Sequence, residues 1–379
     1  MNIEPAWTIG IEEEYFLVEQ ETGHLIKKQP PGLMKKVAEL RHGVVGKELL
    51  SSQIEIGTVV CNDLAYLRAD IGLLRMAVTE AANAYGLAPI AASSHPFAKW
   101  RQQQVSEGER YQIITQDLQQ VARQLVISGL HVHVGIEDPE LRIDLMNQIA
   151  YFLPHLLALS TSSPFWEGRD TGLKSYRTSV FAPMPRTGLP EKFHSWSDFK
   201  QQVDVLVQAG IIEDSTKVWW AVRPSERYPT LEMRVTDLPT KMEDTIAIAS
   251  AYLCLLRMLW RLRQDNQHWR SYSRLLVSEN IWRAQRYGIN DKLVDFGKSI
   301  LVPFSDLMEE MIELVMPDAE ALNCVQELEH IRTICQRGTS ADRQLAVYHE
   351  AVEAGATEDE AIKAVVDTLI ADTLAPPPS

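Results

Sequence analysis

The sequence predicts an α+β protein with a mixed or antiparallel β-sheet. Strand-like segments lie mainly before residue 237 and helical segments mainly after it, which is typical of that class. Short hairpin-like pieces in the first part favour antiparallel pairing over a doubly wound parallel sheet. The sequence contains neither G-x-G-x-x-G nor G-x-x-x-x-G-K-[ST], so neither a Rossmann fold nor a P-loop is predicted. G-x-S-x-G is also absent, which argues against a serine hydrolase.

The first part, residues 1–241, is expected to alternate strands with amphipathic helices. Alternating apolar residues predict strands at Gly10–Phe16, Ser52–Ile56, Leu87–Ser93, Leu130–Val134 and Thr230–Val235. Apolar residues at helical spacing predict helices at 67–85, 111–125 and 139–159. The irregular stretch at 160–190 is rich in Ser, Thr, Gly, Pro and Arg, and its aromatic and charged residues favour a functional loop.

The second part, residues 242–374, is predicted to be nearly all helix. Its most apolar segment, Thr245–Trp260, is too short to span a bilayer and contains Arg257, so we expect a buried core helix. Thr357 followed by Glu360 is a capping-box signature for the last helix. We expect residues 1–374 to form a single domain and residues 375–379 to form a flexible tail.

Composition excludes several classes of protein. Hydrophobic residues make up 45% and charged residues 23% of the chain, as in ordinary globular proteins. The net charge of −14 and the lack of a basic patch argue against nucleic-acid binding. The four cysteines are scattered without a C-x-x-C pair, so no zinc knuckle is predicted. No secretory signal is recognisable, and we expect a cytoplasmic protein that does not bind a membrane.

Ionisable side chains gather on one face of four predicted strands. Side chains alternate between the two faces of a strand, so residues two apart project together. The pairs are Glu12 and Glu14, Gln53 and Glu55, His131 and His133, and Glu232 and Arg234. Crowded carboxylates raise each other's pKa, by up to roughly 3–5 units, unless cations neutralise them. The pattern therefore suggests a metal-dependent enzyme, whereas Glu13 projects to the opposite face and is expected to be structural.

Each pair also has an interpretation without a metal. Glu12 and Glu14 could lie on a solvated edge strand, and His131 and His133 could be hydrogen-bonded core histidines. A His-x-His pair also occurs in zinc hydrolases and cupin-like sites. Two histidines with three or more carboxylates favour Mg²⁺ or Mn²⁺ over zinc. A surface ion pair between Glu232 and Arg234 is less favoured, because the other face of that strand is apolar.

Arginines accompany the carboxylates. Arg234 shares a strand face with Glu232, an arrangement that a purely hydrolytic metal centre does not need. Phosphoryl transfer needs such positive charge around the oxygens of the moving phosphoryl group. The other candidates are Arg223 and Arg227, close to that strand, and Arg169 and Arg177, in the irregular stretch. This cationic set fits ATP or an acyl phosphate, and we expect Arg223 to contact the nucleotide.

Six motifs are distributed over nearly the whole chain. They are G-I-E-E-E-Y-F-L-V at 10–18, S-Q-I-E-I at 52–56, G-L-H-V-H-V-G at 129–135, S-P-F-W-E-G-R-D-T-G at 163–172, P-T-L-E-M-R at 229–234 and G-T-S-A-D-R-Q at 338–344. In this order they resemble the motifs of the type 2 glutamate–cysteine ligase family, a branch of the glutamine synthetase superfamily. The most similar subgroup is the bacterial carboxylate–amine ligases, which are assigned weak glutamate–cysteine ligase activity.

The resemblance implies a cupped, mainly antiparallel sheet with helices packed on its outer face, the glutamine synthetase-like catalytic fold. It implies that His133 binds on the nucleotide side, that Arg234 binds phosphate and that Arg177 binds the substrate carboxylate. The implied ligands of two or three Mg²⁺ ions are Glu12, Glu14, Glu55, His131 and Glu232. A further acidic ligand is implied after Glu55, and Asp63 has the expected spacing.

The expected function is therefore an ATP-dependent carboxylate–amine ligase. It would phosphorylate the side-chain carboxylate of glutamate, or of a similar acid, and condense it with an amine such as cysteine. ATP and Mg²⁺ are the expected cofactors, with Mn²⁺ as the alternative metal, and a homo-oligomer is expected from the superfamily. The alternatives are a metal-dependent hydrolase, a guanidino kinase, or a non-catalytic protein that has kept the nucleotide pocket.

Overall fold

A seven-stranded antiparallel sheet forms the centre of the protein. The computed structural model describes residues 4–40 and 44–374, and the expected tail at 375–379 lies outside the described residues. The strands follow the order β10-β11-β5-β1-β3-β2, and β4 pairs with the C-terminal end of β1. Every pairing in this sheet is antiparallel, as predicted. The bounds are β1 (Ile9–Glu19), β2 (Val44–Lys47), β3 (Gln53–Gly57), β4 (Leu87–Ile90), β5 (Leu130–Gly135), β10 (Val222–Pro224) and β11 (Thr230–Met233).

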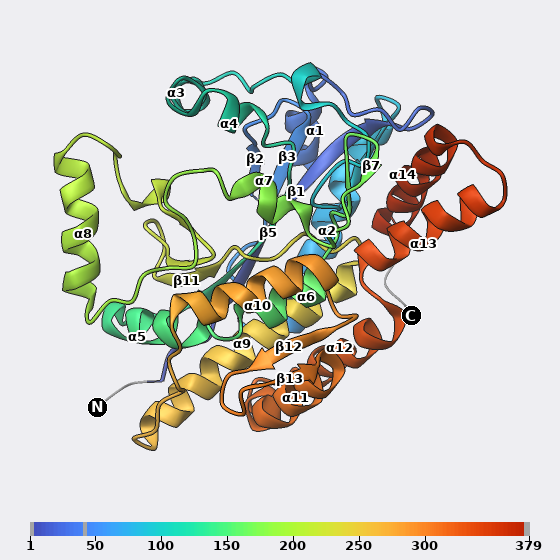
Figure 1. The fold of residues 1–379 in the computed structure, drawn as a ribbon. Helices are drawn as coiled ribbons and strands as arrows, with labels where there is room; N and C mark the ends of the chain where they lie inside the picture. Colours follow the sequence, from blue (N-terminus) through green and yellow to red (C-terminus); the bar gives the residue numbers. More distant parts are fainter. Residues whose placement is uncertain (1–3, 41–43, 375–379) are drawn as a thin grey trace.

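Helices cover one face of the sheet (Figure 1). Helices α2 and α9 pack against it, α5 contacts the edge strand β10 and its neighbour β11, and α6, α10, α11 and α12 pack around α9 and one another. Helices α13 and α14 form a pair on one side of the molecule, and α8 lies on the other (Figure 1). The bounds are α1 (Leu33–Leu40), α2 (Leu64–Asn83), α3 (Glu109–Leu118), α4 (Gln120–Arg123), α5 (Pro139–Ile149), α6 (Leu153–Ser160), α7 (Tyr176–Phe181), α8 (Trp196–Gln208), α9 (Met242–Gln264), α10 (Arg274–Tyr287), α11 (Phe304–Ala321), α12 (Val325–Arg337), α13 (Ser340–Glu353) and α14 (Glu358–Leu374).

Several segments differ from the sequence predictions. The edge strands β2 and β10 were not predicted. The helix expected at 111–125 divides into α3 and α4 at Gln119, whose φ of 49° lies in the left-handed region. Residues 242–374 are mostly helix, as predicted, but they also contain one hairpin that was not predicted. In that hairpin Leu293 and Val302 pair across the strands and are both buried. The bounds of the remaining strands are β6 (Phe165–Trp166), β7 (Arg169–Asp170), β8 (Thr187–Gly188), β9 (Trp219–Trp220), β12 (Lys292–Asp295) and β13 (Ile300–Pro303).

Helix α9 is the central helix of the core, as the sequence predicts. With 23 residues it is longer than expected, and by length and composition alone it could cross a membrane. However, 78% of its most apolar window is buried inside the protein. Its apolar character is therefore accounted for by contacts with the sheet and with the neighbouring helices.

The alternation of side chains gives the sheet one apolar and one polar face. Ile11, Ile54, Val132 and Leu231 are almost completely buried in the main core. Glu13 shares this apolar face of β1, where the Arg75 guanidinium of α2 donates Nη2 to Oε1 at 2.6 Å and Nε to Oε2 at 2.9 Å. Thr245 of α9 donates to the same carboxylate at 3.1 Å. Glu13 therefore links β1 to both covering helices, which is the structural role expected for it.

Candidate active site

The strand register brings the predicted site residues together on the polar face. The cross-strand partners are Glu12 with His131, Glu14 with Glu55, His133 with Glu232, and Glu232 with Arg223. Glycines lie opposite three of these side chains: Gly57 opposite Glu12, Gly10 opposite His133 and Gly46 opposite Glu55. Because a glycine has no side chain, none of these three ionisable groups faces a bulky side chain on the strand opposite it.

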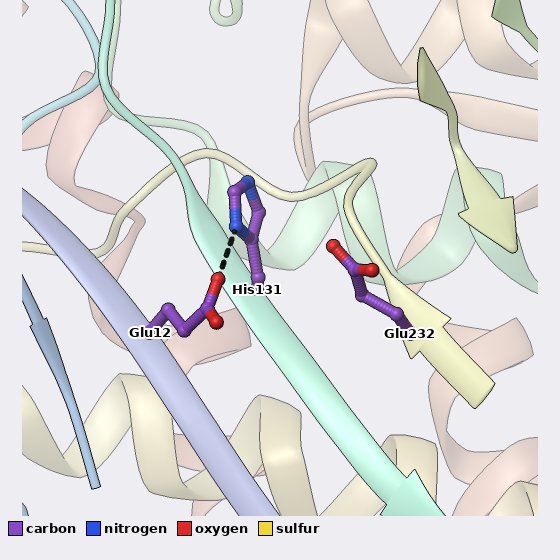
Figure 2. A group of neighbouring side chains, drawn as sticks. All are labelled: Glu12, His131 and Glu232. Atoms are coloured by element: carbon purple, nitrogen blue, oxygen red, sulfur yellow. Dashed lines mark hydrogen bonds and ion pairs between the residues drawn. The ribbon is translucent and has the colours of Figure 1, made fainter. Parts of the chain in front are cut away.

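Glu12, His131 and Glu232 form a compact group of potential metal ligands (Figure 2). One ligand atom of each residue lies within 4.8 Å of the others. His131 Nδ1 lies 3.0 Å from Glu12 Oε2, and Glu232 approaches from the neighbouring strand β11. Two carboxylates and one imidazole from three strands match the donors that a divalent cation such as Mg²⁺ or Mn²⁺ can accept.

Burial and neighbouring charged groups determine which of these side chains are ionised at neutral pH. Burial and the nearby Arg234 lower the pKa of His131 to about 4, so this imidazole is neutral at neutral pH and can act as a ligand. Burial alone would raise the pKa of Glu12, but hydrogen bonds with His131 and His133 hold it well below its usual range. Burial alone would lower the pKa of His133, but Glu12 and Glu232 raise it. The group therefore combines ionised carboxylates with one neutral imidazole.

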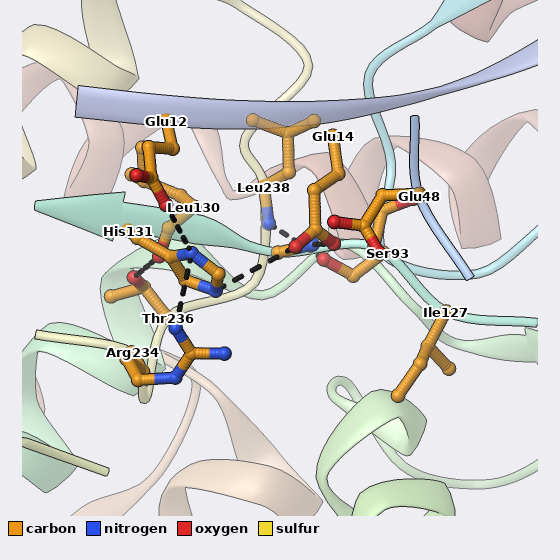
Figure 3. A network of polar contacts seen from close by, with 12 residues as sticks. Glu12, Glu14, Glu48, Ser93, Ile127, Leu130, His131, Arg234, Thr236 and Leu238 are labelled. Atoms are coloured by element: carbon orange, nitrogen blue, oxygen red, sulfur yellow. Dashed lines mark hydrogen bonds and ion pairs between the residues drawn. The ribbon is translucent and has the colours of Figure 1, made fainter. Parts of the chain in front are cut away.

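A second acidic group lies beside the first and consists of Glu14, Glu48 and Glu55. Burial and the charge of Glu48 raise the pKa of Glu14 to about 8. Burial and Glu48 also raise the pKa of Glu55 well above its usual value. Figure 3 shows Glu14 and Glu48 next to each other. Three carboxylates this close need a cation to ionise together, so the residues present fit a further metal ion.

Glu48 is the acidic residue that the sequence analysis missed. It directly follows β2, which pairs with β3 and so returns the chain to Glu55. The hairpin-like spacing between Val45 and its partner Ile56 is the signal that could have placed it. Asp63, in contrast, is exposed and caps α2, where its Oδ1 accepts a hydrogen bond from the Tyr66 amide at 2.7 Å. Asp63 therefore serves as a helix cap and does not line the cavity, so its spacing alone does not make it the further ligand.

Two arginines flank Glu232. Arg223 Nε donates to Glu232 Oε2 at 2.8 Å, and Arg234 Nη1 donates to Oε1. Burial alone would raise the pKa of Glu232, but Arg234 and Arg223 hold it well below its usual range. Nε of Arg234 is buried without a hydrogen-bond partner. The arginines are thus held in place by Glu232, and Arg234 keeps a donor available for an anionic ligand.

Arg177 lies at the same site, although its place in the irregular stretch gives it no strand register. Its Nη2 donates to the Arg234 carbonyl at 3.2 Å, and its Nε is buried without a partner. The guanidinium packs over Gly129, where an added Cβ would lie 2.5 Å from Nη2. Arg177 is thus fixed by the backbone while one donor stays unpaired.

Asp237 connects the segment that carries Arg177 to the end of β11. Its buried carboxylate accepts hydrogen bonds from Ser163 Oγ at 2.7 Å and from Ser175 Oγ at 2.8 Å. Ser163 Oγ in turn accepts from the Arg177 amide at 3.1 Å. Sequence analysis missed this residue, because nothing in its local pattern reveals two serine partners that are distant along the chain.

The predicted residues line one cavity of about 490 Å³. Arg227 also lines this cavity, whereas Arg169 is exposed on β7 and does not. The predicted site residues that line it are Glu12, Glu14, Glu55, His131, His133, Arg177, Arg223, Glu232 and Arg234. Carboxylates, imidazoles and guanidinium groups therefore converge on a space that suits a phosphorylated ligand together with metal ions.

Two solved ligases share this fold. The glutamate–cysteine ligase from Francisella tularensis, solved in complex with AMP, aligns with a TM-score of 0.67 and 13% identity over 98% of this chain and 90% of that chain. A bifunctional glutathione synthetase from Pasteurella multocida aligns with a TM-score of 0.63 and 12% identity over 97% of this chain and 52% of that chain. At such low identity the likeness shows a common fold.

Comparison of sequences identifies the family. A relative in Rhodospirillum rubrum with the provisional name glutamate–cysteine ligase 2 is 56% identical over 377 residues, which cover 98% of this chain and 97% of the relative. A relative of the same name in Jannaschia sp. is 49% identical over 366 residues, covering 97% of this chain and 96% of the relative. The family model for glutamate–cysteine ligase family 2 matches residues 8–368. The protein therefore belongs to glutamate–cysteine ligase family 2.

Proposed function

We propose that the protein is a Mg²⁺-dependent ligase that uses ATP to join a carboxylate to an amine. The observation that carries this proposal is the convergence of Glu12, His131 and Glu232 with Arg223 and Arg234 in one cavity. Transfer of a phosphoryl group depends on positioning and on neutralising charge, which this combination of groups can provide. Membership of the glutamate–cysteine ligase family and the fold shared with an AMP-bound ligase support the proposal.

In the first step, the carboxylate of glutamate or of a similar acid attacks the γ-phosphorus of ATP. A bond forms between the carboxylate oxygen and phosphorus, and the bond from phosphorus to the ADP oxygen breaks. Arg234 would donate to the phosphoryl oxygens as their charge develops, and Arg177 would orient the acid through its unpaired donor. Mg²⁺ would supply further positive charge at the phosphate oxygens when held by Glu12, Glu14, Glu55, His131 and Glu232.

In the second step, the amine nitrogen attacks the activated acyl carbon. A C–N bond forms, the C–O bond to phosphate breaks, and the amine loses a proton as phosphate leaves. This sequence needs no nucleophile from the protein. Accordingly, none of the four cysteines lines the cavity, and Cys61, Cys254 and Cys324 are buried.

The proposal is tested by measuring whether ADP release requires both the carboxylic acid and the amine. We expect the purified protein to release ADP in Mg²⁺ and ATP when a carboxylic acid and an amine are both present, with one amide formed per ADP. Glu232→Gln should abolish this turnover because both arginines lose their shared carboxylate, and circular dichroism should show a retained fold. Glu279→Gln on the exposed surface of α10 is the matched control and should keep wild-type activity.

The alternative functions predict different products. A kinase would accumulate a stable phosphorylated product without an amide, and a hydrolase would act without ATP. Unchanged ADP release by Glu232→Gln would remove that residue from the site. Mg-ATP binding without turnover for any pair of acid and amine would contradict the proposed ligase.

A further inference from the structure

We propose that the start of helix α13 positions Arg177 for the acid substrate by holding the segment 161–177, which ends at that arginine. This inference rests on the proposed ligase function. The motif G-T-S-A-D-R-Q at 338–344 forms the start of α13, and none of these residues, all described by the structure, lines the cavity. Its polar side chains bind the segment instead, with Lys174 and Thr161 as the positioning residues.

The first contact of α13 lies just before Arg177 in the chain. Lys174 Nζ lies 2.7 Å from Asp342 Oδ1, and the two side chains are only 18% and 17% exposed. Asp342 is fixed in turn, because its Oδ2 accepts hydrogen bonds from the Thr339 amide at 2.9 Å and from Thr339 Oγ1 at 2.8 Å. Burial alone would raise the pKa of Asp342, but Lys174 and Thr339 hold it below its usual value. Lys174 is therefore paired with an ionised carboxylate that the helix cap keeps in place.

The second contact lies at the beginning of the segment. Thr161 Oγ1 donates to Thr339 Oγ1 at 2.9 Å, and the Thr161 carbonyl accepts from the Ala341 amide at 3.0 Å. Gln344 Nε2 donates to the Ser162 carbonyl at 2.8 Å. The side chains of Thr161, Thr339 and Gln344 are almost completely buried, so water cannot replace these bonds. Helix α13 thus holds the segment at both ends.

The two ends of the segment also pair with each other at Arg177. The Ser163 amide donates to the Lys174 carbonyl at 3.2 Å, and the Ser163 carbonyl accepts from the Tyr176 amide at 2.9 Å. Ser163 Oγ accepts from the Arg177 amide at 3.1 Å. A shift of either end would therefore move the backbone of Arg177, and with it the guanidinium whose Nε is left free for a ligand.

The arginines on the phosphate side of the site are held by other contacts. Arg223 and Arg234 are fixed by the carboxylate of Glu232, which lies on the sheet. Loosening the segment 161–177 should therefore weaken binding of the acid by Arg177 and leave binding of ATP unchanged.

Replacement of Lys174 tests the inference. In an assay with ATP, Mg²⁺, glutamate and cysteine, Lys174→Met should raise the KM for glutamate by roughly three- to tenfold and leave the KM for ATP unchanged. The loss is partial because the Lys174 amide also donates to the Gln285 carbonyl at 2.7 Å. Lys174→Arg keeps the positive charge and should retain the wild-type KM for glutamate. Lys200→Met is the matched control, because it removes an ion pair with Asp204 on the exposed surface of α8 and should change neither constant.

The outcome that contradicts the inference is specific. Equal rises of the KM for glutamate and for ATP in Lys174→Met would show a general loss of structure. An unchanged KM for glutamate, or a rise confined to the KM for cysteine, would also overturn the proposed positioning of the acid.

A double-mutant cycle tests whether Lys174 acts through Arg177. Arg177→Met should itself lower kcat/KM for glutamate, and adding Lys174→Met should then lower it by less than about twofold further. Independent effects of the two substitutions, whose fold-changes multiply, would overturn the inference. Where turnover of the Arg177→Met variants is too slow, glutamate affinity from titration calorimetry with Mg-ADP replaces kcat/KM in the same cycle.

A second variant and a binding measurement cover the remaining outcomes. Thr161→Val removes the hydroxyl that donates to Thr339 and should also raise the KM for glutamate alone, so it decides if Lys174→Met does not fold. Calorimetry with Mg-ADP should show weaker glutamate binding by the folded variant than by the wild type. Absence of ADP release by the wild type with every pair of acid and amine would contradict the ligase function, whereas equal glutamate affinities would contradict the positioning. The two failures can therefore be told apart.

Discussion

Glu13 and Glu12 are neighbours on β1, yet their replacement by glutamine should affect different properties of the protein, stability in one case and turnover in the other. Glu13 is fully buried and bonds through both carboxylate oxygens to Arg75, while Thr245 and Tyr15 donate to it as well. Glu12 faces the cavity, and its side chain is 30% exposed. Glu13→Gln should therefore strongly lower the stability of the fold, whereas Glu12→Gln should abolish turnover with a smaller loss of stability.

The expected loss of folding stability in Glu13→Gln comes from the buried charge of Arg75, which the substitution leaves without its partner. Arginine does not lose its proton at accessible pH, so Glu13→Gln leaves the Arg75 guanidinium buried without a counter-charge. Removing one partner of a buried ion pair costs about 3–5 kcal/mol of unfolding free energy. Arg75 keeps one hydrogen bond, to the Thr240 carbonyl at 2.8 Å, which offsets only part of this cost. Glu12→Gln removes a charge that His131 and His133 favour but that repels Glu55, and the side chain is partly exposed, so its loss of stability should be smaller than that of Glu13→Gln.

Urea unfolding followed by circular dichroism measures both effects. The double variant Glu13→Gln, Arg75→Met should lose less stability than the sum of the two single variants, because the buried charge is then removed as well. Equal stability losses for Glu12→Gln and Glu13→Gln, or a loss below about 1 kcal/mol for Glu13→Gln, would refute the assignment of the two faces of β1.

Three further predictions concern pH, substrate positioning and metal binding. His95 is buried, with Nε2 2.9 Å from the Gly23 carbonyl, and burial lowers its pKa to about 4. Between pH 4 and about pH 6.5 the imidazole of His95 is protonated in the unfolded chain but neutral in the folded protein, so stability should fall as the pH falls through this window. His95→Phe should therefore flatten the dependence of the urea midpoint on pH. Asp237→Asn should loosen Arg177 and raise the KM for the acid roughly tenfold without changing the KM for ATP; equal changes in both constants would show a general loss of structure instead. Glu48→Gln should raise the Mg²⁺ concentration that gives half-maximal ADP release by roughly 10–100-fold, and an unchanged Mg²⁺ titration would exclude Glu48 from the metal site.

The parts of the site that lie on regular strands could be predicted from sequence. The two-residue period of a strand is local information, and it places Glu12 apart from Glu13 before any partner is known. The antiparallel sheet then aligned Glu12 with His131, and His133 with Glu232. The capping box of the last helix is also local and is present, with the Glu360 carboxylate accepting from the Thr357 amide at 2.8 Å.

The parts that depend on tertiary contacts could not be predicted. Glu48 lies just beyond a short edge strand, where alternation no longer indicates a face. Asp63 has suitable spacing from Glu55, but an aspartate before a helix satisfies the helix amides, and that local hydrogen bond decides its position. Asp237 acts through serines that are distant in sequence, so only the folded chain reveals it.

The wide separation of Glu12, His131 and Glu232 along the chain has a consequence during protein synthesis. A growing polypeptide exposes β1 and β5 well before β11 has left the ribosome, so the first two side chains emerge without the third. A metal ion held by all three of these residues, as proposed, would therefore stabilise only the finished sheet and not a partly made chain. Until β11 arrives, the open edge of β5 is a surface for wrong strand pairing, and chaperones are the natural protection for it.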